Sequence, residues 1–250
     1  MPTLLTCNSL PPVSWQALPA VYGQDEVAIF GVRVAENSQH APRQYALLAA
    51  DEQRRAQRYH RAPDRHRFLV ARAALRVLLG AYLKQPPSTI SFGAGLNHKP
   101  RLAAAPSVHF NVAHAGDWVL LAIAAGEVGV DVERIAPDFP FQEVLDYSFS
   151  LAEKNVITQH PASRALFYQS WTRKEAFVKA TGQGMTEDFG HLPSLDGQHY
   201  LATTPSPVAA WAVSSFGLAT GYAAAVAYPA TVAPSQLAFY EAGEALFLNL

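Results

Sequence analysis

Two kinds of hydrophobic spacing divide this chain into predicted helices and strands. Apolar residues recur every three or four positions over 65–83 and 164–181, which predicts two long helices that each bury one face. A shorter charged segment over 47–59 is also predicted to be helical. Residues 1–24 are rich in proline and show neither period, so we expect them to be irregular.

Short runs of β-branched and aromatic residues predict the strands. They fall at 26–34, 90–92, 101–102 and 127–135, and as hairpins at 108–112 with 118–124 and at 211–215 with 221–228. A helix followed by a hairpin thus occurs twice, which indicates a weak internal repeat. We expect an α+β fold of two similar halves, residues 1–125 and 126–250, with the functional site between them.

The composition is that of a globular protein, because half of the 250 residues are hydrophobic and 16% are charged. The formal charge of −1 gives no support to nucleic-acid binding. The single cysteine, Cys7, excludes an internal disulfide and suits a reducing compartment. No secretory leader or membrane-spanning apolar run is found, so we expect a soluble, cytoplasmic protein with no membrane partner.

Two acidic residues, Asp131 and Glu133, lie two apart in a predicted strand, so their side chains share one face. Val130 and Val132 share the other face. Neighbouring carboxylates suit Mg²⁺, which binds a few protein oxygens and completes its shell with water and phosphate. The same pattern describes the solvated face of an antiparallel strand, so the pair does not by itself establish a metal site.

A third carboxylate, Glu175, lies in the second long helix between Trp171 and Lys179, each four residues away on the same face. Apolar neighbours would remove water from this carboxylate, which is costly unless hydrogen-bond donors or a cation, such as Lys179 or a metal ion, replace the water. The alternative is an exposed Glu175–Lys179 pair, which would contribute only about 0.3–0.5 kcal/mol. Gly182 marks the end of the helix.

Five separated motifs carry a resemblance to a known family. They are R-Y-H-R-A-P-D-R-H-R at 58–67, K-P at 99–100, F-N-V-A-H-A-G-D-W at 110–118, G-V-D-V-E-R at 129–134 and W-T-R-K-E-A-F-V-K-A-T-G-Q-G at 171–184. In this order they resemble the Sfp-type 4′-phosphopantetheinyl transferases, over about residues 47–228. The resemblance implies the fold of that family, in which two α+β halves are related by a pseudo-twofold axis. This agrees with the internal repeat.

The resemblance also implies an activity. It is the Mg²⁺-dependent transfer of the 4′-phosphopantetheine arm of coenzyme A to a serine of an apo acyl or peptidyl carrier protein, with release of 3′,5′-ADP. Carried over by position, Asp131, Glu133 and Glu175 would hold the metal. Lys179 would neutralise charge on the phosphates, and Glu175 would take the proton of the serine, either directly or through a metal-bound water.

Contacts to the rest of coenzyme A are assigned by the same resemblance, mostly to the half 1–125. Family positions that bind the 3′-phosphate and adenine are matched by Arg55, Arg67, Lys99 and His114. Lys174 is a further candidate from the half 126–250, which would also hold the metal and the catalytic residues. The first four have structural alternatives. Arg55 could be a solvated helix charge, Lys99 a loop lysine and His114 a cap of backbone groups. The stem of Arg67 could cover an apolar face. Both halves lie on one chain, so we expect a monomer.

Three positions depart from the family. Ala113 and Ala115 flank His114 where many members have serines, and Phe68 stands where some members have threonine. The missing hydroxyls leave open how the 3′-phosphate is held, and Arg54 is a candidate replacement. These changes do not affect the three carboxylates.

Carrier recognition rests on less specific signals. An apolar set follows the acidic strand, comprising Phe141, Val144, Leu145, Tyr147 and Phe149. Family members place an apolar patch against the carrier here, although a core role suits most of these residues better. Arginines within 54–76 are expected to attract acidic carriers.

Two other functions use parts of the same pattern. One is a different Mg²⁺-dependent phosphohydrolase, which would not need the motifs at 58–67 and 99–118. The other is a non-catalytic nucleotide-binding protein, which would not need both Glu175 and Lys179. No H-E-x-x-H, C-x-x-C, G-x-S-x-G or Walker A motif is present, so zinc, serine-hydrolase and P-loop chemistry are not supported. The sequence does not select among fatty-acid, polyketide and non-ribosomal-peptide carriers.

Overall fold

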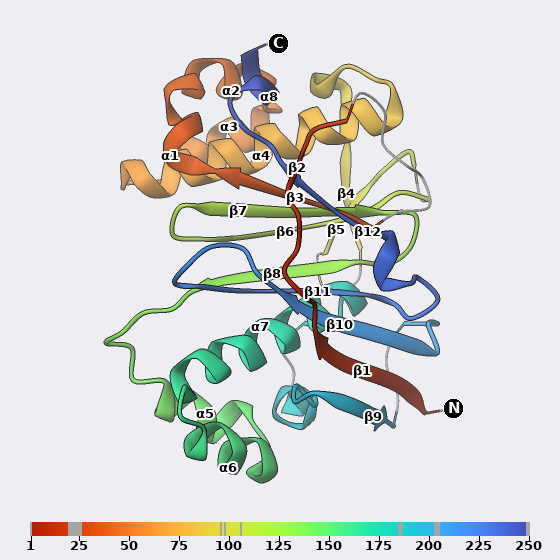
Figure 1. The fold of residues 1–250 in the computed structure, drawn as a ribbon. Helices are drawn as coiled ribbons and strands as arrows, with labels where there is room; N and C mark the ends of the chain where they lie inside the picture. The colour runs from red at the N-terminus through yellow and green to blue at the C-terminus, as the bar shows by residue number, and fades with distance from the viewer. Residues whose placement is uncertain are drawn as a thin grey trace.

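Two five-stranded sheets pack face to face at the centre of the molecule, and one long helix covers the outer face of each (Figure 1). This computed structural model describes residues 2–19, 27–95, 97, 99–105, 107–184, 187–202 and 206–248. The layers run helix, sheet, sheet, helix. They make the α+β fold that the sequence predicts.

The first sheet has the strand order β2-β12-β3-β7-β6. Its strands are β2 (Gln16–Ala17), β12 (Leu237–Glu241), β3 (Val27–Arg33), β7 (Trp118–Ala124) and β6 (His109–Ala115). The covering helices are α4 (Ala62–Leu83), which packs directly on the sheet, and α1 (Val34–Asn37), α2 (Ala41–Leu47), α3 (Ala50–Gln57) and α8 (Ala245–Leu248), which contact α4. A two-stranded ribbon, β4 (Phe92–Ala94) with β5 (Pro100–Leu102), contacts β6 through β5.

The second sheet has the strand order β8-β11-β10-β1-β9. Its strands are β8 (Gly129–Arg134), β11 (Tyr222–Pro229), β10 (Ala210–Phe216), β1 (Thr3–Ser9) and β9 (Gly197–Leu201). The helices on this side are α7 (Ser163–Thr181), which packs on β8, β10 and β11, and α5 (Phe141–Ser148) and α6 (Leu151–Gln159), which contact α7.

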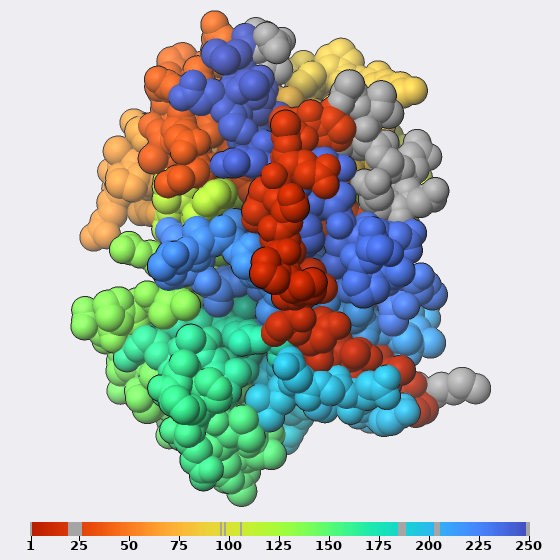
Figure 2. All heavy atoms as spheres, in the orientation of Figure 1, coloured from red at the N-terminus to blue at the C-terminus, as the bar shows by residue number. Residues whose placement is uncertain are grey.

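The internal repeat is confirmed by the strand order. β3, α4 and the β6–β7 hairpin in one half correspond to β8, α7 and the β10–β11 hairpin in the other. The antiparallel order β3-β7-β6 matches β8-β11-β10. The two ends of the chain cross over, because β1 pairs with β10 in the second sheet and β12 with β3 in the first. Figure 2 shows the N-terminal segment, in red, running over the surface from one half to the other.

The division at residue 126 stays a prediction. The structure adds that each sheet also contains a strand from the opposite end of the chain. Residues 2–19 are not irregular as expected, because they include β1, in which alternate side chains are buried. The pattern also misses α1, α2, α5, α8, β2, β9 and β12, most of which are too short to show a period. Among the described residues, no helix has the length and apolar character needed to cross a membrane.

The core explains how the site residues are oriented. Val130 and Val132 of β8 pack between the two sheets, with Ile29 and Leu120 of the first sheet. Because side chains alternate along a strand, Asp131 then points to the opposite face, towards α7. The predicted alternation in this strand is confirmed.

Candidate active site

The predicted metal ligands lie on two adjacent elements, β8 and α7. Gly129, at the start of β8, allows these elements to approach closely. A Cβ atom at this position would lie 2.0 Å from the carbonyl oxygen of Ala176 and 2.4 Å from the amide nitrogen of Ala180. Only a residue without a side chain permits such contact between the two backbones. The close approach brings the side chain of Asp131 into contact with the helix.

Asp131 is the most deeply buried of the three candidate carboxylates, with 4% of its surface exposed. The Nζ atom of Lys179 lies 2.6 Å from its Oδ1 atom. Its other oxygen, Oδ2, is buried and has no hydrogen-bond partner among the residues that the structure describes. Such an atom is costly to bury, so it marks a place where an additional cation or donor would bind favourably.

A cavity of about 300 Å³ lies over Asp131, between β6, β8 and α7. It is lined by Val112, Ala113, His114, Asp131, Val132, Glu133, Trp171, Glu175 and Lys179. The structure thus brings together both predicted catalytic residues, all three predicted metal ligands and one predicted coenzyme A contact. These residues come from both halves of the chain.

Acidic charge dominates the electrostatics of this cavity. Burial raises the pKa of Asp131 to about 7, and the charges of Glu133 and Glu175 add to the rise while Lys179 opposes it. Burial also raises the pKa values of Glu133 and Glu175 above their ordinary range. Three carboxylates therefore share one ammonium, and a divalent cation would correct this imbalance.

The side chains present fit a hard divalent cation, because carboxylate oxygens are the ligands that Mg²⁺ prefers. Within the described part of the chain, no three acidic, histidine or cysteine side chains already form a metal cluster. Asp131, Glu133 and Glu175 therefore stay a predicted ligand set. The unpartnered Oδ2 atom and the charge imbalance support it.

His114 lies near the end of β6 beside the acidic cavity, and not in the hairpin turn. Burial lowers its pKa, and the nearby charges of Arg67, Lys179 and Arg55 lower it further. The imidazole therefore loses its proton more readily than a free histidine does, and three cations lie around it. This arrangement suits the binding of a phosphate group.

Two of these cations are held by contacts of their own. Arg67 donates from Nε to the carbonyl oxygen of Gly116 at 3.0 Å and from Nη1 to the carboxylate of Asp64 at 3.0 Å. The guanidinium of Arg55 lies 5.3 Å from the ring centre of Phe68. Phe68 lacks the hydroxyl of a threonine, but its ring supports Arg55 through a cation–π contact.

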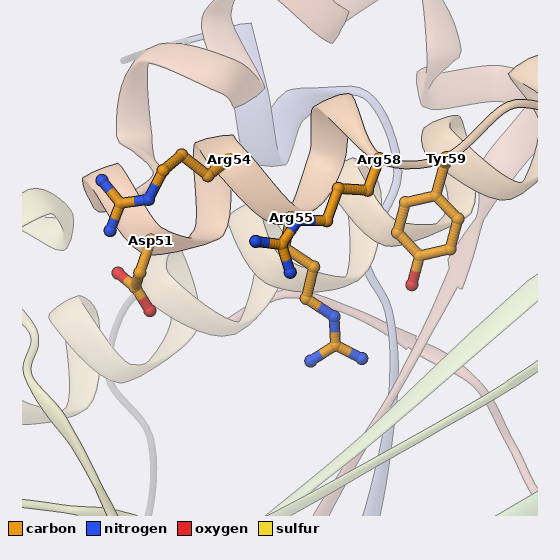
Figure 3. A pocket seen from close by; sticks show the side chains of 5 residues that line it. All are labelled: Asp51, Arg54, Arg55, Arg58 and Tyr59. Atoms are coloured by element: carbon orange, nitrogen blue, oxygen red, sulfur yellow. The ribbon is translucent and has the colours of Figure 1, made fainter.

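A second cavity, of about 510 Å³, lies along α3 and the turn that follows it (Figure 3). It is lined by Asp51, Arg54, Arg55, Arg58 and Tyr59. In Figure 3 the side chains of Arg55 and Tyr59 point the same way, whereas Arg54 extends beside Asp51. Arg54, the candidate replacement for the missing hydroxyls, thus lines a cavity shared with Arg55.

Lys99 does not line the acidic cavity. Its Nζ atom donates to the carbonyl oxygens of Ala180 at 2.7 Å and Val128 at 3.3 Å. Burial lowers its pKa to about 8, although the charge of Glu127 opposes this. It borders a third cavity, of about 560 Å³, which Glu127 and His109 also line. Its contact with coenzyme A stays a prediction.

Lys174 points away from the acidic cavity. Its side chain is fully buried, and Nζ donates to Glu153 Oε2 at 3.1 Å and to the carbonyl oxygen of Ser148 at 2.8 Å. It also lies 4.2 Å from the ring centre of Phe149. Successive residues of a helix are turned by about 100°, so Lys174 faces α6 while Glu175 faces the cavity. This corrects the expectation that Lys174 contacts coenzyme A.

Asn111 is a contributor that the sequence pattern does not single out. It is buried, and its Oδ1 atom accepts a hydrogen bond from the backbone nitrogen of Val130 at 3.0 Å. This bond fastens β6 to β8, although they belong to different sheets. The signal in the sequence is a polar amide within an apolar strand, since such a group needs a partner when it is buried.

The apolar residues that follow β8 belong mainly to the core. Phe141, Leu145 and Phe149 are buried, which confirms the preferred interpretation, whereas Tyr147 is 89% exposed. Val144 lines a mostly apolar cavity of about 340 Å³. This cavity shares two lining residues with the acidic one and therefore lies next to it.

Comparisons with known proteins agree with this arrangement. The sequence profile described as "4′-phosphopantetheinyl transferase, N-terminal" matches residues 37–126. The profile described as "4′-phosphopantetheinyl transferase superfamily" matches residues 127–227. The two matches meet at the boundary between residues 126 and 127.

Individual relatives carry the same description. The slr0495 protein of Synechocystis sp., named for this transferase activity, is 38% identical over 150 residues, 58% of this chain and 61% of that protein. A 4′-phosphopantetheinyl transferase of Bacillus subtilis is 30% identical over 146 residues, 58% of this chain and 64% of that protein. The chain thus covers slightly less than two thirds of these two relatives. The 4′-phosphopantetheinyl transferase psf-1 of Bacillus pumilus is 34% identical over 186 residues, 72% of this chain and 78% of that protein. The chain therefore belongs to the 4′-phosphopantetheinyl transferase superfamily.

Proposed function

We propose that this protein transfers the 4′-phosphopantetheine arm of coenzyme A to a serine of an apo carrier protein and releases 3′,5′-ADP. One observation carries the proposal. Asp131, Glu133, Glu175 and Lys179, from two separated motifs, line one cavity in which a buried carboxylate oxygen has no partner among the described residues. Family membership favours this activity over the phosphohydrolase and the non-catalytic alternatives.

The acidic residues would bind the pyrophosphate through a metal ion. Asp131, Glu133 and Glu175 would hold Mg²⁺, which when bound polarises phosphate oxygens and neutralises their charge. The ammonium of Lys179, 30% exposed and already directed at Asp131, is placed to neutralise negative charge that develops on the leaving phosphate.

Glu175 is our candidate for the general base. In the reaction, the carrier serine Oγ forms a bond to the phosphorus that carries pantetheine, and the bond from this phosphorus to the oxygen of the leaving 3′,5′-ADP breaks. The serine proton passes to the Glu175 carboxylate. In the metal-free protein, burial raises the pKa of Glu175.

The 3′-phosphate of coenzyme A would lie against His114, Arg55 and Arg67. Two guanidinium groups offer several charged donors in fixed directions, which compensates for the hydroxyls that Ala113 and Phe68 lack. The electrostatic coupling of both arginines to His114 supports this placement.

The carrier would approach from the side of the apolar cavity, because this cavity adjoins the acidic one. The acyl or peptidyl nature of the carrier, the monomeric state and the cytoplasmic location stay predictions.

The test is a transfer assay with the full-length protein, Mg²⁺, coenzyme A and a panel of apo acyl and peptidyl carriers, read by intact-protein mass spectrometry. We expect at least one carrier to gain the mass of 4′-phosphopantetheine, and chelation of the metal to stop the reaction. Hydrolysis of coenzyme A without any modified carrier would instead favour a phosphohydrolase. If neither carrier modification nor coenzyme A hydrolysis is observed, the proposal is contradicted.

A further inference from the structure

The C-terminal end of α7 is held by two side chains from the loop between β4 and β5. The Nδ2 atom of Asn97 donates to the carbonyl oxygens of Gly182 at 2.9 Å and Gln183 at 2.7 Å. The Nζ atom of Lys99 donates to the carbonyl oxygen of Ala180 at 2.7 Å. The last carbonyl groups of a helix have no partner within the helix, so these side chains cap α7.

Lys99 also reaches the second element of the site. Its Nζ atom lies 3.3 Å from the carbonyl oxygen of Val128, immediately before β8. One ammonium therefore bridges α7 and β8. The bridge is close to the catalytic groups along the chain, because Lys179 precedes Ala180 and Asp131 is three residues after Val128.

We propose that Asn97 and Lys99 are positioning residues that hold α7 against β8. They thereby set the distance between Glu175 and the carboxylates of β8. For Lys99 this role differs from the expected contact with coenzyme A. The catalytic consequence rests on the proposed function. The positioning itself rests only on hydrogen bonds between the two halves.

The backbone of Asn97 supports this assignment. Its φ angle is 47°, in the left-handed region that asparagine adopts more readily than most residues. Gly184, with a φ of 71°, lies beside it, so that a Cβ atom on the glycine would be 3.6 Å from the Asn97 amide. The loop and the end of α7 thus have complementary backbone conformations at their contact.

The charge of Lys99 is sensitive to pH. Burial lowers its pKa to about 8, while the carboxylate of Glu127 acts in the opposite direction. His109 is the other titratable neighbour, and burial and the charge of Lys99 keep its pKa low. Above pH 8 the ammonium loses its charge, so its hydrogen bonds to the carbonyl groups weaken. An arginine in its place would stay charged.

The test combines hydrogen exchange with kinetics in the full-length protein. The variants are Lys99→Met, which removes the ammonium, and Asn97→Gly, which removes the amide but tolerates a positive φ. Lys84→Met, at an exposed lysine that also has a positive φ, is the matched control. Losing donors to buried carbonyl groups should speed exchange of the amides at 179–184 by roughly 5- to 100-fold. The control should exchange like the wild type.

Kinetics separate positioning from binding of coenzyme A. Positioning predicts that Lys99→Met lowers kcat and raises the Mg²⁺ concentration required, while the KM for coenzyme A at saturating metal changes less than about twofold. It also predicts that Lys99→Arg keeps a larger share of its kcat at pH 9 than the wild type does.

A higher KM for coenzyme A with unchanged kcat and unchanged exchange would overturn the proposal and assign Lys99 to the substrate. Unchanged exchange in both Lys99→Met and Asn97→Gly would overturn it as well. A wild-type protein without transferase activity would refute the proposed function alone, because the exchange measurement needs no turnover.

Discussion

Glu153 and Asp131 are both buried carboxylates that contact α7, yet their surroundings differ. Glu153 accepts hydrogen bonds from Lys174 at 3.1 Å and from the hydroxyl of Ser194, so both of its oxygens are satisfied. Asp131 has Lys179 on one oxygen, and its other oxygen has no partner in the described part of the protein. Both lysines belong to one helix and lie five residues apart.

This difference separates a structural acid from a functional one. The Glu153–Lys174 pair is closed to solvent, with side chains 5% and 0% exposed, and it joins α6 to α7. The Asp131–Lys179 pair borders a cavity, and the carboxylates of Glu133 and Glu175 add to its charge. A satisfied pair fixes the helix, whereas an unsatisfied acid beside a cavity retains the capacity to bind a ligand.

The largest effect is expected when a functional acid loses its charge. Glu175→Gln should lower the transfer rate by roughly 10²- to 10⁴-fold, because it removes the proposed base and a metal ligand together. The free energy of unfolding should stay the same or rise, since a buried charge is removed. Intact-protein mass spectrometry of the carrier and urea unfolding measure the two effects. Glu143→Gln, at an exposed position of α5, is the control, and full activity in Glu175→Gln would exclude Glu175 from catalysis.

The structural acid should show the opposite balance. Glu153→Gln leaves the Lys174 ammonium buried without its counter-charge, which should lower the free energy of unfolding by about 3–5 kcal/mol. Urea unfolding measures this loss, and the double variant Glu153→Gln with Lys174→Met should lose less than Glu153→Gln alone. Below the unfolding transition, Mn²⁺ affinity should match that of the wild type. A protein of normal stability with weakened metal binding would reverse the roles assigned to Glu153 and Asp131.

The sequence predicts the repeated part of the fold well and the crossed ends poorly. α4, α7 and the two hairpins are long enough to show a period of hydrophobic residues. β12 has only five residues, whereas β1 has seven, as many as the predicted strand β3. The partners of both strands are far away in sequence, as with Leu5 opposite Trp211. Which sheet receives such a strand depends on the assembled core, so local spacing does not encode it.

The same distinction applies to the candidate site. Asp131, Glu133 and Glu175 converge as expected, because each lies on an element whose buried face the sequence defines. The partners of Lys99 and Lys174 are not predictable in this way, although the helical turn of about 100° per residue already directs Lys174 away from Glu175. These partners are carbonyl groups at the end of α7 and an acid in another helix, which become neighbours only in the folded protein.

A smaller effect is expected when the two elements of the functional site are forced apart. Gly129→Ala would place a methyl group 2.0 Å from the carbonyl oxygen of Ala176, so α7 must shift away from β8. Such overpacking typically costs about 1–3 kcal/mol. We expect kcat and metal affinity to fall while the Glu153–Lys174 pair stays intact. Gly243→Ala, where an added Cβ meets nothing within 4 Å, is the control. Normal kcat in Gly129→Ala would show that the β8–α7 distance does not limit the reaction.

The smallest expected effect concerns stability and pH in the metal-free protein. Burial raises the pKa of Asp131 to about 7, so the folded protein holds this proton to a higher pH than the unfolded chain, where the carboxyl ionises near pH 4. The unfolded state therefore binds fewer protons between about pH 4 and 7, and Asp131 makes the free energy of unfolding fall as the pH rises through this window. Asp131→Asn removes this dependence, and Lys179, 30% exposed, can recover water when it loses its partner.

The stability of Asp131→Asn relative to the wild type should consequently increase by roughly 1 kcal/mol or more from pH 4 to pH 7 and stay level above pH 8. Urea unfolding at each pH measures it, with the exposed Asp138→Asn as control. Saturating Mg²⁺ should reverse the order, because an ion that binds the folded wild type stabilises it and the variant lacks a ligand. The free energy of unfolding of Asp131→Asn relative to the wild type could instead stay level or fall from pH 4 to pH 7. Asp131 would then be as fully paired as Glu153, and the contrast between the two acids would fail.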